Sequence, residues 1–107
     1  MLLTGCGAGP DGVTVELLGE EPPGLVLRLN ATHFAEMPLL ATLLDANTHS
    51  EAYPDAYRVN STRVDYSLDR DSSRKLHAYL ESHGLVNPFL VEDQGRYYSL
   101  SIYFLAC

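Results

Sequence analysis

The 107-residue chain has a single lysine, two cysteines and no tryptophan. Fourteen acidic residues stand against seven basic ones, so the formal net charge is -7 at pH 7. A negative field of this size repels phosphate backbones and anionic lipid surfaces. We therefore expect no nucleic-acid partner, and we interpret the acidic excess as solvated surface.

Long apolar runs are missing as well. No stretch approaches the roughly 20 apolar residues that cross a bilayer, so we expect no transmembrane helix. The composition, 46% hydrophobic and 20% charged, is typical of a folded protein, and the length suits one domain. Residues 1–12 are rich in glycine and predict a flexible tether, whereas residues 13–107 predict a single domain.

Recognisable motifs for catalysis and metal binding are also lacking. The chain has no P-loop, no Gly-x-Ser-x-Gly and no Gly-x-Gly-x-x-Gly after an expected strand. An EF-hand register starting at Asp65 fails, because Arg70 takes the glycine position and Leu76 the glutamate position. Residues 45–51 carry ligand-type side chains, which we interpret as a solvated loop. The histidines have no metal-ligand spacing, and they are His33, His49, His77 and His83. The sequence thus predicts no metal site, no cofactor and no catalytic residue.

The first half of the domain shows two alternating segments and a helix. Residues 13–17 and 25–29 alternate apolar and polar side chains around a turn-rich stretch, which predicts a β-hairpin with a six-residue loop at 19–24. Thr32 is expected to cap a short helical turn that begins near His33. The main helix is expected from Pro38 to Ala46, followed by a polar loop from Asn47 to Pro54.

The second half predicts strands within 57–68, around a turn at 60–62, and then a helix. Asp71 or Ser72 is expected to cap this helix, and Gly84 to end it in a left-handed conformation. Residues 89–92 and 96–105 predict a hairpin around 93–95. The element order β-β-α-β-α-β-β predicts a two-layer α+β domain, with a mostly antiparallel sheet and two helices on one face.

The apolar positions of these elements predict one core. Each member belongs to the buried phase of its own helix or strand. The predicted core residues are Leu40, Leu44, Leu76, Leu80, Leu100, Ile102 and Phe104.

The last strand also predicts a surface rich in tyrosine. Tyr98 lies on the core side of the alternation, whereas Tyr97 and Tyr103 lie on the opposite side with serines. Tyrosine offers apolar contact and a hydroxyl group at low entropic cost. This side is usually the solvent face of a sheet, and the alternative hypothesis is an interaction face for an unidentified protein partner.

One short segment near the N-terminus has the pattern of a protein-sorting signal. Leu3-Thr4-Gly5-Cys6 resembles the lipobox of prokaryotic lipoproteins, in which small residues precede an invariant cysteine. The resemblance implies that the Cys6 sulfur receives a diacylglyceryl group and that cleavage makes Cys6 the mature N-terminus. It also implies a basic and apolar leader, encoded in frame before Met1. The glycines after Cys6 would then serve as a spacer.

The resemblance leads to our first functional hypothesis, a lipid-anchored envelope protein that is non-catalytic and acts in binding or structure. The membrane would then be a partner through Cys6, and Cys107 would remain a free thiol or pair with another chain. Export without lipidation would instead allow a disulfide between Cys6 and Cys107. Two alternatives stay open: a soluble cytoplasmic accessory protein with a reduced Cys6, and a small enzyme whose site is assembled from scattered histidine and acidic residues.

Overall fold

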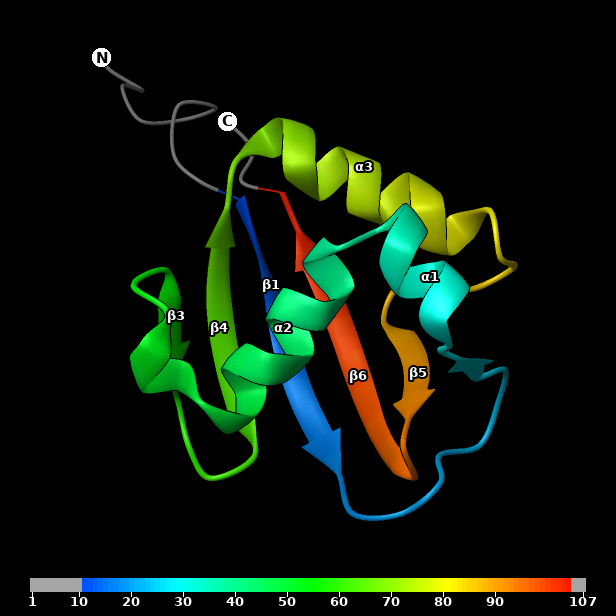
Figure 1. Cartoon of the computed structure of the whole chain (residues 1–107), viewed down its shortest axis with the longest axis horizontal. Coiled ribbons are helices and arrows are strands. Elements are labelled where there is room, and N and C mark those ends of the chain that lie inside the picture. Colours follow the sequence, from blue (N-terminus) through cyan, green and yellow to red (C-terminus); the bar gives the residue numbers. More distant parts are fainter. Residues whose placement is uncertain (1–10, 105–107) are drawn as a thin grey trace.

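A computed structural model describes residues 11–104 of the chain (Figure 1). Its centre is a six-stranded sheet in the order β2-β5-β6-β1-β4-β3. Only the β2–β5 pair is parallel, so the sheet is mostly antiparallel as predicted. The strands are β1 (Asp11–Leu18), β2 (Leu27–Arg28), β3 (Ala56–Arg58), β4 (Arg63–Leu68), β5 (Phe89–Asp93) and β6 (Arg96–Tyr103).

Three α-helices pack on one face of this sheet, which makes a two-layer α+β domain (Figure 1). The helices are α1 (Ala31–Glu36), α2 (Leu39–Thr48) and α3 (Arg70–Glu81). The prediction of two helices was one short, because the turn expected near His33 forms the helix α1. The expected polar loop is also partly helical, since α2 continues to Thr48 and a 3-10 turn, η1 (Ser50–Ala52), follows it.

The predicted hairpin between residues 13–17 and 25–29 does not form. β1 pairs with β4 on one side and β6 on the other, so neither of its edges is open to β2. The connection containing Pro22 and Pro23 carries the chain to the far edge of the sheet, where β2 pairs with β5. Alternation predicted strand conformation but could not identify the pairing partner.

Two helix caps also differ from the prediction. Asn30, rather than Thr32, caps α1: its side chain accepts hydrogen bonds from the backbone amides of Thr32 and His33. Asp69, rather than Asp71 or Ser72, caps α3 by accepting from the Ser72 amide at 3.0 Å. The Ser72 hydroxyl and amide also lower the pKa of Asp69, because both donate to its charged form. Asparagine and aspartate are both among the residues preferred at this position.

The C-terminal hairpin forms as predicted, and its turn is tight. Gln94 and Gly95 occupy the two turn positions with φ of 52° and 81°. Such positive angles at both positions favour asparagine-like residues and glycine, and they match the twist of the flanking strands. The turn places Asp93 and Arg96 directly opposite each other.

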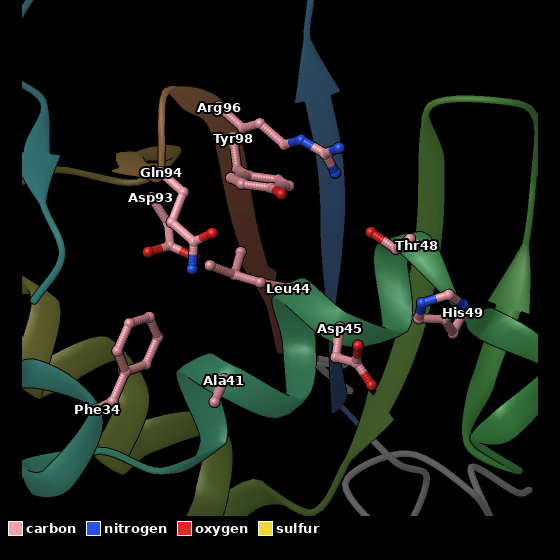
Figure 2. Close-up of a pocket in the computed structure, with 10 residues that line it drawn as sticks. All are labelled: Phe34, Ala41, Leu44, Asp45, Thr48, His49, Asp93, Gln94, Arg96 and Tyr98. Atoms are coloured by element: carbon pink, nitrogen blue, oxygen red, sulfur yellow. The ribbon is translucent and has the colours of Figure 1, made fainter. Parts of the chain in front are cut away.

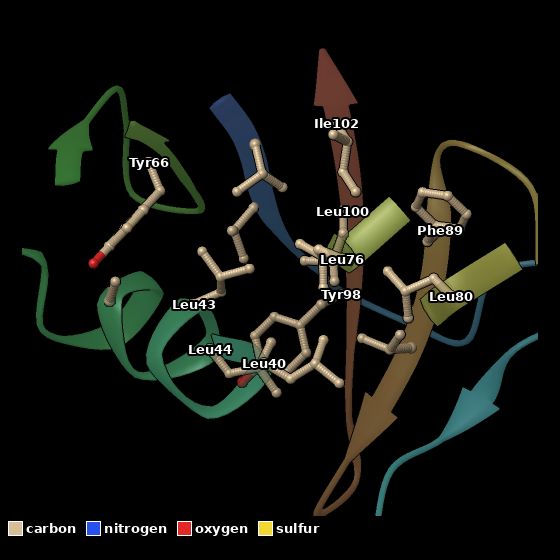
Figure 3. Close-up of a cluster of buried hydrophobic side chains, with 14 of the residues drawn as sticks. Leu40, Leu43, Leu44, Tyr66, Leu76, Leu80, Phe89, Tyr98, Leu100 and Ile102 are labelled. Carbon is tan, nitrogen blue, oxygen red and sulfur yellow. The ribbon is translucent and has the colours of Figure 1, made fainter. Parts of the chain in front are cut away.

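The predicted core is confirmed with one exception. Leu40, Leu76, Leu80 and Leu100 are fully buried in one cluster between the helices and the sheet (Figure 3). Phe104 is the exception, since it is 39% exposed beyond the end of β6 and packs edge-on against the His77 ring.

The first strand begins at Asp11, the first residue that the structure describes. The Asp11 side chain is buried. Its carboxylate accepts two hydrogen bonds from the Arg70 guanidinium, at 2.8 and 3.0 Å. This ion pair fastens the start of β1 to the first turn of α3.

Candidate functional site

A hollow opens on the helix side of the sheet, between α2 and the β5–β6 turn (Figure 2). Its volume is about 570 Å³, within the roughly 300–1,000 Å³ typical of small-molecule sites. Residues distant in the sequence converge on it, and they are Phe34, Ala41, Leu44, Asp45, Thr48, His49, Asp93, Gln94, Arg96 and Tyr98.

The helix wall follows from the phase of α2. Ala41, Asp45 and Thr48 lie on one face of the helix because they are spaced by four and three residues. Leu44, beside this face, is buried and contributes to the hollow and to the core. The helix thus presents two polar side chains, Asp45 and Thr48, to the hollow beside the buried, apolar Leu44.

The opposite wall is the β5–β6 hairpin, and it carries two opposite charges. Asp93 and Arg96 face each other across the tight turn, yet neither forms an ion pair or a side-chain hydrogen bond within residues 11–104. Desolvation raises the pKa of Asp93, and the neighbouring Glu92 charge raises it further. Both charged groups therefore face the hollow without an ion-pair or hydrogen-bond partner for their side chains within residues 11–104.

The remaining carboxylate of the hollow is already engaged. Asp45 accepts a hydrogen bond from the Tyr53 hydroxyl at 2.5 Å. This hydrogen bond, together with desolvation, raises the pKa of Tyr53. The Asp45 carboxylate is therefore held by Tyr53 and is less free than Asp93 to bind a ligand directly.

A second hollow, of about 360 Å³, adjoins the first and shares Thr48 and Arg96 with it. Arg58 also lines it, but its guanidinium donates to Ser50 Oγ at 3.2 Å and to the carbonyl oxygens of Asn47 and Asn60. Arg96 is therefore the cation that remains available at the junction of the two hollows.

The hollow does not assemble an acid–base pair. The His49 ring lies 3.9 Å from the Glu51 carboxylate, and no hydrogen bond joins it to Asp45 or Asp93. Within residues 11–104, no three histidine, cysteine or acidic side chains gather where they could hold a metal ion. The arrangement can bind a charged molecule, and it lacks a nucleophile with an adjacent base.

Sequence reasoning missed this site. Asp45 and His49 were interpreted as solvated polar residues without a functional role. Asp45 lies in α2, within the helix predicted to Ala46, and His49 is the C-cap residue of that helix. Asp93 was assigned to a turn and Arg96 to a strand, without a functional role. One signal in the sequence could have indicated the site. Asp93 and Arg96 carry opposite charges on either side of the Gln94-Gly95 turn, close to the buried Tyr98.

The uncovered face of the sheet holds the two tyrosines of the interaction hypothesis. Tyr97 lies beside Arg28, and the Tyr97 hydroxyl raises the pKa of that guanidinium. Arg28 is also 3.6 Å from both Glu21 and Glu92. Tyr97 is thus part of a local polar network at the β2 edge.

Tyr103 is held against the sheet. Its ring lies over Gly12, opposite it on β1, and a Cβ atom at Gly12 would overlap that ring and lie 2.9 Å from the Tyr66 carbonyl oxygen. Burial raises the pKa of Tyr103, and the nearby Asp65 charge adds to this. The two tyrosines therefore lie far apart along β6 and do not form one patch.

Cys6, the expected lipidation site, and Cys107 lie outside the described residues. None of the helices in residues 11–104 is long and apolar enough to cross a bilayer. A scan against protein-family models and searches of curated proteins and of solved structures found no match to this chain.

Proposed function

We propose that this protein is a small, non-catalytic binding domain, held at the outer face of a prokaryotic membrane by a lipid on Cys6. The ligand site is the hollow between α2 and the β5–β6 turn. The observation that carries the proposal is the pair Asp93 and Arg96, whose charged side chains line a hollow of ligand size and form no ion pair within residues 11–104.

The position of the hollow suits a tethered domain. Along β1 the register runs from Gly12, opposite Tyr103, to Leu18, opposite Tyr97. The hairpin turn that lines the hollow lies at the Leu18 end, about 20 Å from the Gly12 end at roughly 3.3 Å per residue. β1 begins at Asp11, beside Gly12, so an anchor on Cys6 would join the described domain at the end opposite the hollow.

The anchor predicts a specific mass. The protein, expressed in a bacterium with its native upstream sequence, should lose residues 1–5 and gain a diacylglyceryl group on Cys6. Intact-mass spectrometry of the membrane fraction checks this result, and Cys6→Ser is the control that should abolish both changes. An exported chain with an unmodified Cys6, or with a Cys6–Cys107 disulfide, contradicts the anchor because lipidation consumes the Cys6 sulfur.

The DNA before Met1 separates this proposal from the cytoplasmic alternative. An in-frame basic and apolar leader supports export. A stop codon or ribosome-binding site directly before Met1 contradicts it, and the domain would then be an intracellular accessory protein with the same hollow.

Catalysis is the weaker candidate for the hollow. The hollow does collect Asp45, His49 and Asp93, and aspartate and histidine are residue types that act as general acids and bases in enzymes. However, Asp45 accepts a hydrogen bond from Tyr53, and no hydrogen bond joins His49 to Asp45 or Asp93, so no proton-transfer pair is in place among the described residues. Binding is therefore the function that the geometry supports best.

The site itself is tested by a substitution that fills the hollow with a larger side chain. Ala41 is exposed and lines the hollow, so Ala41→Trp should occupy the space without disturbing the core. NMR spectra recorded with a library of amino acids, short peptides, sugars and nucleosides should show shifts at Thr48, Gln94 and Arg96. The tryptophan should remove those shifts, whereas Ala78→Trp, on the exposed side of α3, should retain them. Shifts that persist in Ala41→Trp, or the absence of shifts with every class, contradict the site.

A further inference from the structure

We infer that the hollow binds a zwitterion: a free amino acid or a di- or tripeptide with charged termini. This inference rests on the proposed function and names its ligand class.

The first step is that the fold separates two charges which could have neutralised each other. Asp93 and Arg96 are direct cross-strand partners, a position at which opposite charges usually attract. No ion pair forms between them, and each lines the hollow instead. A ligand that carries both charges would supply the missing partner of each.

The ammonium end is assigned to the Asp93 side. Figure 2 shows Phe34 and Asp93 on the same side of the hollow, away from Thr48. A carboxylate accepts hydrogen bonds from an ammonium group, and an aromatic ring attracts a cation over its face. A bound cation here would also relieve the repulsion between Asp93 and Glu92, which contributes to the raised pKa of Asp93.

The carboxylate end is assigned to Arg96. Its guanidinium extends over Tyr98 towards the Thr48 side of the hollow (Figure 2). A guanidinium can donate two parallel hydrogen bonds to one carboxylate. The hydroxyls of Thr48 and Tyr98 make no hydrogen bond with residues 11–104, and both line the same hollow.

The charge balance argues against other ligand classes. A phosphate-like dianion would meet Asp45 and Asp93 with only one arginine to offset them. A simple cation would meet Arg96. A zwitterion satisfies both ends, and about 570 Å³ accommodates two or three small residues above the apolar floor formed by Leu44.

The experiment compares peptides whose termini are blocked one at a time. Alanyl-alanine, its N-acetyl form, its C-terminal amide and the doubly blocked form are titrated by calorimetry and NMR. We expect each single block to weaken binding about tenfold or more, because each removes a charge-assisted hydrogen bond.

Two variants assign the ends. Arg96→Gln should weaken alanyl-alanine to the level of its amide and leave no difference between the two. Asp93→Asn should weaken alanyl-alanine to the level of its N-acetyl form and leave no difference between those two peptides. The matched controls Arg74→Gln and Glu20→Gln change exposed charges away from the hollow and should retain the full discrimination.

The outcomes separate the ligand class from the site. Equal binding of free and doubly blocked peptides, or no binding of alanyl-alanine, trialanine or any free amino acid at millimolar concentration, overturns the zwitterion. If another library compound still shifts Thr48 and Arg96 and Ala41→Trp removes its binding, the proposed site survives that failure. If no compound does so, both fail.

Discussion

Replacing Leu80 by alanine is expected to lower the free energy of unfolding by about 2–5 kcal/mol. Leu80 is fully buried in the last turns of α3, in the cluster that includes Leu76 and Phe89. Truncation removes apolar contacts and leaves a cavity that the packed neighbours cannot fully close. Urea denaturation followed by circular dichroism measures the loss.

Leu25→Ala is the matched control, because Leu25 is 62% exposed in the long β1–β2 connection. Its midpoint should change little, by about 0.5 kcal/mol or less. A Leu80→Ala protein with an unchanged midpoint would contradict the assignment of the buried face of α3.

The second large effect is expected at the buried ion pair. Arg70→Met leaves the Asp11 carboxylate, whose side chain is fully buried, without the two guanidinium hydrogen bonds. A buried charge that loses two charge-assisted hydrogen bonds is strongly destabilising. Asp11→Ala should cost less, about 1–3 kcal/mol, because water can reach the partly exposed Arg70 once the carboxylate is gone. We therefore expect Arg70→Met to be the more damaging substitution.

Two controls make this asymmetry informative. Arg70→Lys keeps the positive charge but loses the bidentate geometry, so its loss should be intermediate. Arg74→Met lies on the exposed side of the same helix and should leave stability nearly unchanged. Equal losses of unfolding free energy for Arg70→Met and Asp11→Ala would contradict this expectation. They would show that the buried carboxylate is no more sensitive to the loss of these hydrogen bonds than the partly exposed guanidinium.

Local signals in the sequence predicted most elements of the fold. Gly84 adopts φ of +84° and ends α3, and the Gln94-Gly95 turn closes the last hairpin. Leu85 then folds back on α3 and is buried. These features could be predicted because they depend on the backbone preferences of residues close together in the chain.

Pairing of distant segments could not be predicted in the same way. Residues 25–29 alternate like a partner for β1, but β1 is an inner strand with β4 and β6 on its two sides. Alternation encodes which face of a strand is buried, and it contains no information about which edge is free. The same limit hid the role of Asp11, because its partner Arg70 is 59 residues away.

The sequence by itself determined the α+β class, the mostly antiparallel sheet and the phase of the buried leucines, because periodicity and turn chemistry act locally. It also contains the segment Leu3-Thr4-Gly5-Cys6, whose resemblance to a lipobox stays a prediction. Only the tertiary structure decided the strand order and the hollow. Packing α2 against the sheet beside the β5–β6 turn brings Asp45, Asp93 and Arg96 to one opening, and that packing depends on contacts between segments about 50 residues apart.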